Sequence, residues 1–356
     1  MLAVIDCGTT NTRIYLVNEK HEIVASDEVN VGVRDTSISG SKEKLRNAVQ
    51  KLFDDILRKS GIEKKHVRFA VASGMITSEI GLIEIPHLTA PAGIQELSKG
   101  IVKTEDGQVL SLGCPVYFIR GVKNSSSRDA SGLGDLAEMD FMRGEEVQCV
   151  GILSETDVCP PCNIVVLSSH TKNIYINRDG QIEASCTTIS GQLYDALLNA
   201  TLLGSSLVPI SGEECRHDRK ELLQLAMKSV DNNGLGRTLL MARFMQVLME
   251  SSYKERRLLV DAAIAADDMN SFFEMSKQGM NSENYCLVGK KSRCDLYAEM
   301  LHIYFGGNVK VKTISDKAQI GRLTVTGNML VATQYFAEKD AEKKYLQQRS
   351  DYNCSK

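Results

Sequence analysis

Residues 13–26, RIYLVNEKHEIVAS, and residues 173–185, NIYINRDGQIEAS, agree in strand order, in the position of the turn and in several identities once one gap is allowed. Each stretch follows an apolar run that ends in small hydroxyl residues, LAVIDCGTT at 2–10 and IVVLSSHT at 164–171. A separation of about 160 residues is too long for a solenoid repeat. The pattern therefore predicts a duplicated α/β domain, and the alternative is a chance likeness of two hairpins.

The hydrophobic pattern predicts an antiparallel meander of three strands at the N-terminus and a mainly helical second half. Ser41 is the expected cap of the first long helix and Gly61 its end. The remaining expected elements, in chain order, are strands at 2–6, 12–18, 22–28, 67–72, 115–119, 284–289 and 308–314, and helices at 41–60, 139–153, 191–203, 219–230, 235–278, 292–305 and 317–338.

Composition excludes several classes of protein. The net charge of -3, with acids and bases well mixed, argues against a nucleic-acid partner. No apolar run has the roughly 18 residues of a membrane helix, and no leader pattern opens the chain, so a cytoplasmic protein and no membrane partner are expected. The 10 cysteines should then be mainly thiols. The CPPC at 159–162 lacks a second pair for zinc, and its prolines suit a change of domain.

The two turns suggest how a polyphosphate could be held. Gly8 permits close backbone approach, and Thr9, Thr10 and the hydroxyls of 168–171 can donate hydrogen bonds. Asp6, at a strand end, could hold Mg²⁺ through water. No GxxxxGK[ST] or G-x-G-x-x-G follows the first strand, so neither a P-loop nor a dinucleotide site is predicted. The Gly-rich loop at 124–135 is either a connector or a lid over a site.

The layout resembles the actin-like sugar kinase and heat-shock ATPase superfamily, and further blocks resemble the 2-keto-3-deoxy-galactonate kinases. These blocks are SGMITSEIGLIEIPHLTAPAG at 73–93, DFMRGEEVQCVGIL at 140–153, LSSHTKNIYINRDGQI at 167–182 and TTISGQLYDALL at 187–198, with YCLVGKKSRCDLYAEML at 285–301 as a weaker match. The resemblance implies two actin-like (ribonuclease H-like) domains with a nucleotide cleft between them. It places a sugar-acid site in 1–154, an ATP site in 163–338 and a polar tail at 339–356.

The resemblance also implies an activity and a set of site residues. The expected reaction is phosphorylation of the terminal hydroxyl of a 2-keto-3-deoxy sugar acid by ATP and Mg²⁺. A homodimer is a possible assembly. Glu145 is the first candidate for the base. The alternative to a catalytic role for Glu146 is a surface carboxylate, and the alternative for Arg143 is a structural ion pair with a cleft carboxylate. The implied residues are Glu145, Asp140, Glu146 and Arg143 for catalysis; Asn11, Arg13, Gly74, Met75 and Ser78 for the substrate; Gly8, Thr9, Thr10, Ser169, His170, Thr171, Lys172 and Gly289 for ATP; and Asp6 for the metal.

Several positions depart from the family pattern. Cys7 and Asn173 stand where the family has Trp, Thr77 and Ser169 where it has Gly, and Gln192 where it has Glu. These changes leave two readings open, a working kinase with an altered substrate and a weakened member that binds a ligand or regulates. A pantothenate-kinase-like enzyme is a third, which the SGM and RGEE blocks disfavour.

Overall fold

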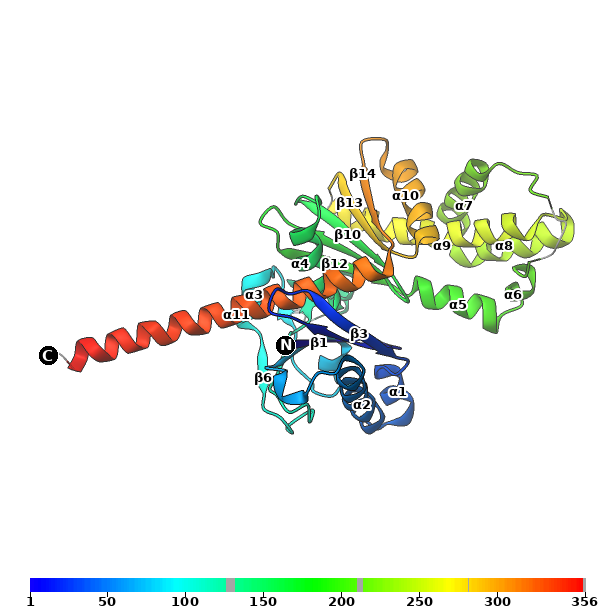
Figure 1. The fold of residues 1–356 in the computed structure, drawn as a ribbon. Coiled ribbons are helices and arrows are strands. Elements are labelled where there is room, and N and C mark those ends of the chain that lie inside the picture. The colour runs from blue at the N-terminus through cyan, green and yellow to red at the C-terminus, as the bar shows by residue number, and fades with distance from the viewer. Residues whose placement is uncertain (126–131, 210–213, 281, 355–356) are drawn as a thin grey trace. The chain divides into compact units, whose positions relative to one another are not determined.

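The computed structural model describes residues 1–125, 132–209, 214–280 and 282–354 (Figure 1). The chain forms two compact units. The first contains residues 1–157, 177–184 and 317–356, and the second contains 158–176 and 185–316. The expected change of domain at the CPPC stretch thus falls beside the observed boundary at Asp157 and Val158.

The first unit is built on a six-stranded sheet of order β3-β2-β1-β4-β7-β6. Strands β1 and β2 are antiparallel, as are β2 and β3, which confirms the expected meander. Strand β1 also pairs in parallel with β4, and β4 with β7. The strand bounds are Leu2–Cys7 (β1), Thr12–Val17 (β2), Ile23–Val29 (β3), Ala70–Gly74 (β4), Val102–Thr104 (β6) and Val116–Phe118 (β7).

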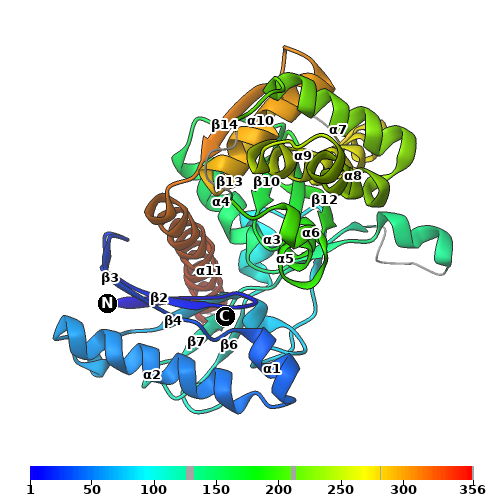
Figure 2. The same cartoon turned by 90° about the vertical axis from the view of Figure 1, so that its right-hand side faces the viewer.

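Helices cover both faces of this sheet (Figure 2). Helix α2, Glu43–Ser60, packs its apolar stripe against one face, and the resulting core includes Ile5, Ile14 and Phe53. Helix α11, Lys317–Cys354, contributes Val325 and Met329 to the opposite face. Both faces of β1 are therefore buried, which explains why its sequence is an unbroken apolar run.

Shorter elements complete the first unit. A small sheet of order β5-β8-β9 lies outside the main one. The bounds are Val33–Ser39 (α1), Lys64–His66 (η1), Met75–Thr77 (η2), Leu88–Thr89 (β5), Ile94–Lys99 (α3), Val122–Lys123 (β8), Leu133–Glu138 (η4), Phe141–Met142 (β9) and Glu145–Glu155 (α4).

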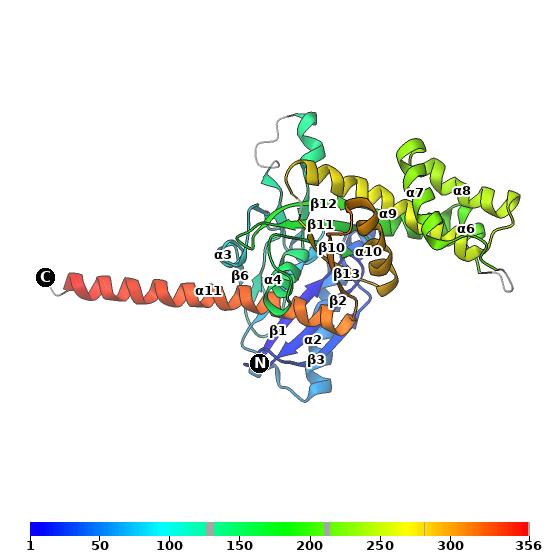
Figure 3. The same ribbon diagram turned by 90° about the horizontal axis from the view of Figure 1, so that it is seen from above.

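The second unit repeats the strand order of the first. Its sheet runs β12-β11-β10-β13-β14, which matches β3-β2-β1-β4-β7. Strands β10 and β11 are antiparallel, and β13 is parallel to β10 and β14, as in the first sheet. A helical insert lies between β12 and β13 (Figure 3). The bounds are Cys162–Leu167 (β10), Thr171–Ile176 (β11), Ile182–Thr188 (β12), Asn284–Gly289 (β13), Lys310–Ile314 (β14), Ser190–Ala200 (α5), Leu203–Ser206 (α6), Arg219–Asn233 (α7), Leu235–Leu248 (α8), Tyr253–Lys277 (α9) and Lys291–Phe305 (α10).

Two pairs of glycines occupy equivalent places in the two units. Gly74 ends β4 opposite Cys7, and Gly289 ends β13 opposite Leu167. Both have positive φ, +88° and +154°, and a Cβ there would lie 2.4 Å from the Cys7 carbonyl oxygen or 2.6 Å from that of Leu167. Likewise, a Cβ on Gly32 or Gly191 would meet carbonyls of the preceding hairpin turn, at 2.5 and 2.2 Å. The repeated geometry supports duplication over a chance likeness.

The start of α4 corrects one expectation. The predicted helix 139–153 begins only at Glu145, because Phe141–Met142 forms β9 and Gly144 has a φ of +111° that a helix cannot contain. Asp140 and Arg143 are therefore not on the helix. The loop expected at 124–135 has its centre, 126–131, outside the described residues, and its end enters the short helix η4.

Other boundaries also differ from the sequence pattern. The stretch 235–278 is two helices, because Ser252 caps α9 in a capping box with Glu255. Ser41 accepts the Glu43 N–H at 3.3 Å, but Lys42 is the N-cap of α2, which Gly61 ends as expected. The strand expected at 67–72 lies at Ala70–Gly74.

The C-terminal helix contradicts the expected domain limits. Helix α11 belongs to the first unit rather than to a domain 163–338, because it packs on α4 and on the first sheet. The predicted frayed tail at 339–356 is wrong as far as Cys354, since the helix continues to that residue. The run AEKKYLQQ holds good helix formers and no Gly or Pro, which explains the extension. None of the helices in the described part of the chain is apolar over a length that would span a bilayer.

We expect Gly74→Ala and Gly289→Ala each to lower the free energy of unfolding by about 2–4 kcal/mol, because the added Cβ meets a backbone carbonyl at a positive φ. Gly307→Ala is the control, since nothing lies within 4 Å of its Cβ position, and it should change stability by less than about 0.5 kcal/mol. Urea unfolding followed by circular dichroism measures all three. Equal stability of the Gly74, Gly289 and Gly307 variants would contradict the constraint.

Candidate functional site

The end of β1 carries a partly buried carboxylate. Asp6 lies 3.4 Å from Arg13 Nη1, and the Arg13 Nε donates to Glu28 at 3.0 Å. Burial raises the pKa of Asp6, and the Arg13 charge opposes that rise. Arg13, expected to bind substrate, thus lies on the neighbouring strand between two carboxylates. Asp6 keeps an exposed side-chain fraction of 18%, so it remains accessible to an ion.

The first hairpin turn is anchored through its carbonyls. The Gly8 N–H donates to the Asn11 carbonyl at 2.8 Å, which closes the turn. The carbonyls of Gly8 and Thr9 accept from the N–H groups of Val33 and Arg34, at the start of α1. Thr9 and Asn11 are half-buried and Thr10 is exposed. The turn is therefore held by its contacts with the start of α1, and the exposed Thr10 hydroxyl can face a ligand.

The segment after β4 is held by its own side chains. Ser78 is buried, and its hydroxyl donates to the Met75 carbonyl at 2.7 Å. Thr77, also buried, donates to the Gly74 carbonyl at 3.1 Å. Ser78 thus fixes the turn rather than presenting a free hydroxyl, whereas Met75 is only half-buried.

The N-terminus of α4 touches this segment. A Cβ on Gly144 would lie 3.3 Å from the Gly74 Cα, so the helix begins directly beside the ends of β1 and β4. Glu145 and Glu146 occupy its first turn, where the helix dipole favours negative charge. The tertiary structure therefore brings together Asp6, Gly8, Gly74, Met75 and the two glutamates, all within the first unit.

Arg143 is a buried cross-link. Its Nη1 donates to the Thr77 hydroxyl at 2.7 Å, and its Nη2 donates to the Ile85 carbonyl at 2.8 Å and lies 3.4 Å from His87 Nδ1. The side chain is 9% exposed, and burial lowers its pKa. The departure at Thr77 thus supplies an acceptor for Arg143. The guanidinium ties the 75–87 segment to the start of α4.

Glu146 differs from Glu145 in its exposure. Glu146 is fully buried, and both its carboxyl oxygens accept the Gly144 N–H, at 2.9 and 2.8 Å. Burial, together with the nearby Glu145 charge, raises the pKa of Glu146 to about 8. Glu145 is half-buried. Asp140 precedes β9, and its Oδ1 accepts the N–H of Phe141 at 2.8 Å. Of the three acids, Glu145 combines exposure with a place at the helix end.

The second turn has the same kind of anchor in the second unit. The Ser169 carbonyl accepts the Gln192 N–H at 2.9 Å, at the start of α5. His170 lies between the Ser169 hydroxyl, 3.2 Å from Nδ1, and the Gln192 amide, 3.4 Å from Nε2. Lys172 is buried and donates to the Thr187 hydroxyl on β12. Gly289, expected near adenine, lies close to the Leu167 carbonyl at the end of β10.

Two functional candidates at this turn were missed from the sequence. The first is Arg293 on α10, which donates to the Ser168 carbonyl at 2.6 Å and to the Thr171 hydroxyl at 2.7 Å. This contact holds a positive charge beside the turn. A signal existed, because an Arg four residues beyond a strand-ending Gly lies in the first turn of the next helix.

The second missed residue is Asp268 on α9, which is fully buried. Its carboxylate accepts from the Thr188 and Ser190 hydroxyls, each at 2.5 Å, and from the Tyr297 hydroxyl, which in turn lies 3.5 Å from that of Thr171. Nothing in the sequence near Asp268 signals this role, since its partners come from two distant segments, 188–190 and the helix that holds Tyr297. The network links α9 to the elements around the second turn.

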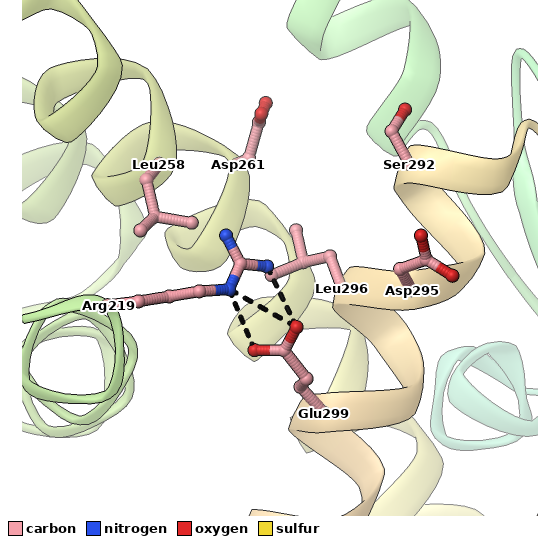
Figure 4. Close-up of a pocket in the computed structure, with 7 residues that line it drawn as sticks. All are labelled: Arg219, Leu258, Asp261, Ser292, Asp295, Leu296 and Glu299. Atoms are coloured by element: carbon pink, nitrogen blue, oxygen red, sulfur yellow. Dashed lines mark hydrogen bonds and ion pairs between the residues drawn. The ribbon is translucent and has the colours of Figure 1, made fainter.

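A pocket of about 430 Å³ lies among α7, α9 and α10 (Figure 4). Arg219 and Glu299 form a bidentate ion pair across it, with N···O distances of 2.9–3.2 Å. Burial raises the pKa of Asp261 in its wall to about 6, and the positive charges of Arg257, Arg293 and Arg219 oppose the rise. Ser292, which lines the pocket, directly precedes Arg293, which donates to the second turn. Ser292, Asp295, Leu258 and Leu296 complete the lining.

The departures from the family pattern concern packing as well as the site. The Cys7 side chain is fully buried in the core, accepts a hydrogen bond from the Thr12 hydroxyl at 3.5 Å, and has a pKa raised to about 12 by burial. Asn173 is buried too and pairs with Asn163 at 3.1 Å. Ser169 and Gln192 are exposed. Cys7 therefore fills core space and presents no group to a ligand.

Glu146→Gln should stabilise the protein at alkaline pH. The folded-state pKa of Glu146, about 8, lies above the unfolded value of about 4.5, so folding of the wild type weakens as pH rises through that window. A neutral amide removes this dependence. We expect the variant to match the wild type near pH 4.5 and to exceed it by about 1–3 kcal/mol at pH 8.5 in urea unfolding. A parallel pH profile for both proteins would contradict the raised pKa.

Comparison with known proteins identifies the family of the chain. The family model described as 2-keto-3-deoxy-galactonokinase matches residues 6–324. The chain is 27% identical over 206 residues to the 2-dehydro-3-deoxygalactonokinase of Escherichia coli (strain K12), an alignment that covers 58% of this chain and 59% of that protein. The alignment thus spans about three fifths of the length of this curated relative.

A solved structure from Sinorhizobium meliloti, provisionally assigned as a 2-dehydro-3-deoxygalactonokinase, superposes with a TM-score of 0.70 at 18% identity and covers 92% of this chain and 98% of that one. This similarity shows the fold, an α/β protein with two actin-like halves, as the sequence predicted. Because the family model spans both repeats and the RGEE and SGM blocks, the chain belongs to the 2-keto-3-deoxy-galactonokinase family.

Proposed function

We propose that this sugar-acid kinase transfers the γ-phosphoryl group of ATP to the terminal hydroxyl of a 2-keto-3-deoxy sugar acid such as 2-keto-3-deoxy-galactonate. The observation that carries the proposal is the contact of the α4 N-terminus with the ends of β1 and β4. Through this contact Glu145, the proposed base, starts a helix beside Gly74, and Gly74 pairs with the end of β1, the strand that carries Asp6, the proposed metal ligand. The hairpin turn that could hold phosphate follows β1 directly. Phosphoryl transfer needs little beyond such positioning and charge.

Glu145 is the proposed base. It is half-buried in the first turn of α4, whereas Glu146 is fully buried and both its oxygens accept the same backbone N–H. A base has to reach the proton it accepts, which favours the accessible acid. Asp140 is the next candidate, since it is half-buried. Arg143, whose fork is engaged by Thr77 and Ile85, acts on the site through these contacts, as a positioning residue.

The sugar acid is proposed to bind near Asn11, Arg13, Gly74 and Met75. Arg13 is a cation at this place, and its fork can hold a carboxylate. Its present partners, Asp6 at 3.4 Å and Glu28 at 3.0 Å, leave it 33% exposed at the side chain. Ser78 contributes by fixing the turn after β4.

The second unit fits a nucleotide. Its turn offers the hydroxyl of Ser169, the His170 ring and the Arg293 charge, which suit an anionic polyphosphate. The pocket volume of about 430 Å³ lies in the range of small-molecule sites, and Ser292 in its lining is the sequence neighbour of Arg293. We assign the phosphates to the turn at 168–172 and the nucleoside end to the pocket. When bound, ATP supplies the phosphoryl group.

Asp6 fits a magnesium ion that is held mainly by phosphates. No group of three or more His, Cys, Asp or Glu side chains in the described ranges could hold a metal by itself. Mg²⁺ bound with a nucleotide typically uses one or two carboxylates and keeps several waters. A single accessible carboxylate at the strand end meets that requirement. A nearby cation would also offset the burial that raises the Asp6 pKa.

The activity is tested by ADP release with Mg·ATP across a panel of 2-keto-3-deoxy sugar acids and hexoses. We expect turnover with at least one sugar acid and none with the hexoses, because Arg13 can pair with a carboxylate. A panel without ADP above background, from protein that still binds a sugar acid in calorimetry, would favour the reading as a ligand-binding or regulatory member.

Glu145→Gln should lower kcat by about 10²–10⁴-fold, the usual contribution of general base catalysis, and leave the KM for ATP within about threefold. The control is Glu63→Gln, which removes a glutamate that is 64% exposed at the side chain from the same unit and should retain wild-type turnover. Single-turnover kinetics measure the chemical step directly. Unchanged turnover in Glu145→Gln would transfer the role to Asp140 or Glu146.

A further inference from the structure

Helix α8 lies in the helical insert of the second unit (Figure 3). Its apolar side chains occupy two opposite faces. The inner face packs on α7 and α9 and buries Leu239, Ala242 and Met245. The outer face carries Leu240, Phe244, Val247 and Leu248, which we call the α8 outer stripe. Three of these side chains are well exposed, at 42% for Leu240, 57% for Val247 and 76% for Leu248.

The spacing of the outer stripe is that of a packed helix face. Its members follow one another by four, three and one residues, so they form one continuous row along the helix. The centre of this row lies on the side of α8 opposite its buried residues, since the two sets differ by about half a turn at 3.6 residues per turn. Within the described part of the chain, three of the four stripe side chains therefore remain well exposed. A continuous apolar face left open in this way is typical of an interaction surface.

The ends of the stripe carry opposite charges. Arg237 lies at the N-terminal end, with its guanidinium 4.7 Å from the centroid of the Phe244 ring. Glu250 lies just beyond the C-terminal end, and both side chains are exposed. The last carbonyls of α8 add negative potential at that same end. One end of the stripe is thus positive and the other is negative.

This charge pattern is complementary to itself under a two-fold rotation. An antiparallel copy of α8, turned about the midpoint between Arg243 and Phe244, has Leu240 opposite Val247. It also brings Arg237 toward the C-terminal end of the other helix, where Glu250 follows its last turn. The same two contacts occur twice, as an isologous interface requires. A parallel partner would instead place like charges together at both ends, which disfavours that arrangement.

We propose that the α8 outer stripe is the interface through which two copies of this chain form a dimer, with their α8 helices antiparallel. The interface would bury the apolar row at its centre and keep the two Arg237–Glu250 pairs at its rim. That is the usual division between a hydrophobic core and a polar edge. The proposal does not depend on the catalytic activity, because every residue in it lies in the helical insert.

Sedimentation equilibrium of the full chain over a range of concentrations tests the dimer. The wild type should show twice the mass of one chain at micromolar concentrations. Val247→Glu combined with Leu248→Glu should weaken the dimer by about 100-fold or more, since it places charges in the buried centre. The control is Ile38→Glu on α1, an equally apolar side chain that is 75% exposed, and it should leave the dimer intact.

Charge reversal tests the antiparallel register. Arg237→Glu and Glu250→Arg should each weaken the dimer by about tenfold, and the two changes together should restore it. Thermal melts verify that each variant is folded. A wild type that is monomeric at every concentration, or a dimer that survives the double glutamate change, would overturn the proposal. A reversed pair no tighter than its single changes would overturn the antiparallel register.

Discussion

The close approach of two parallel strand ends is the constraint on which both halves of this molecule depend. Gly74 at the end of β4 touches the Cys7 carbonyl, and Gly289 at the end of β13 touches that of Leu167. A side chain at either position would push these strands apart. Because the hairpin turn after β1 or β10 starts from the same strand end, this contact also sets where each turn can lie. In the first unit it lets the α4 N-terminus reach the site.

Buried charges with neutral partners stabilise the segments around each turn. In the first unit, Arg143 donates to a hydroxyl and a carbonyl, and in the second, Asp268 accepts from three hydroxyls. A buried charge costs free energy unless its hydrogen bonds are satisfied, so each group selects one arrangement of its neighbours. The substitution at Thr77 is part of this system, since Thr77 is a partner of Arg143.

Much of the fold could be predicted from local patterns. The strand and helix repeat, the meander and the α2 helix follow from periodicity and from glycine at the helix end, because these signals are local. The start of α4 could not be predicted. The apolar pattern of DFMRGEE continues smoothly, and only the contact with β8 turns Phe141–Met142 into a strand. The assignment of α11 to the first unit also depends on long-range packing with α4.

The sequence by itself determined the family, the duplicated architecture and the short list of acids around RGEE. Motifs and hydrophobic periodicity depend only on residues that are close together in the sequence. Only the tertiary structure separated an accessible Glu145 from a buried Glu146 and showed Cys7 to be a core residue. It also brought Asp268 and Arg293 to the second turn. Burial and hydrogen-bond partners depend on segments far apart in the chain, so adjacent residues of the same type can acquire different chemistry.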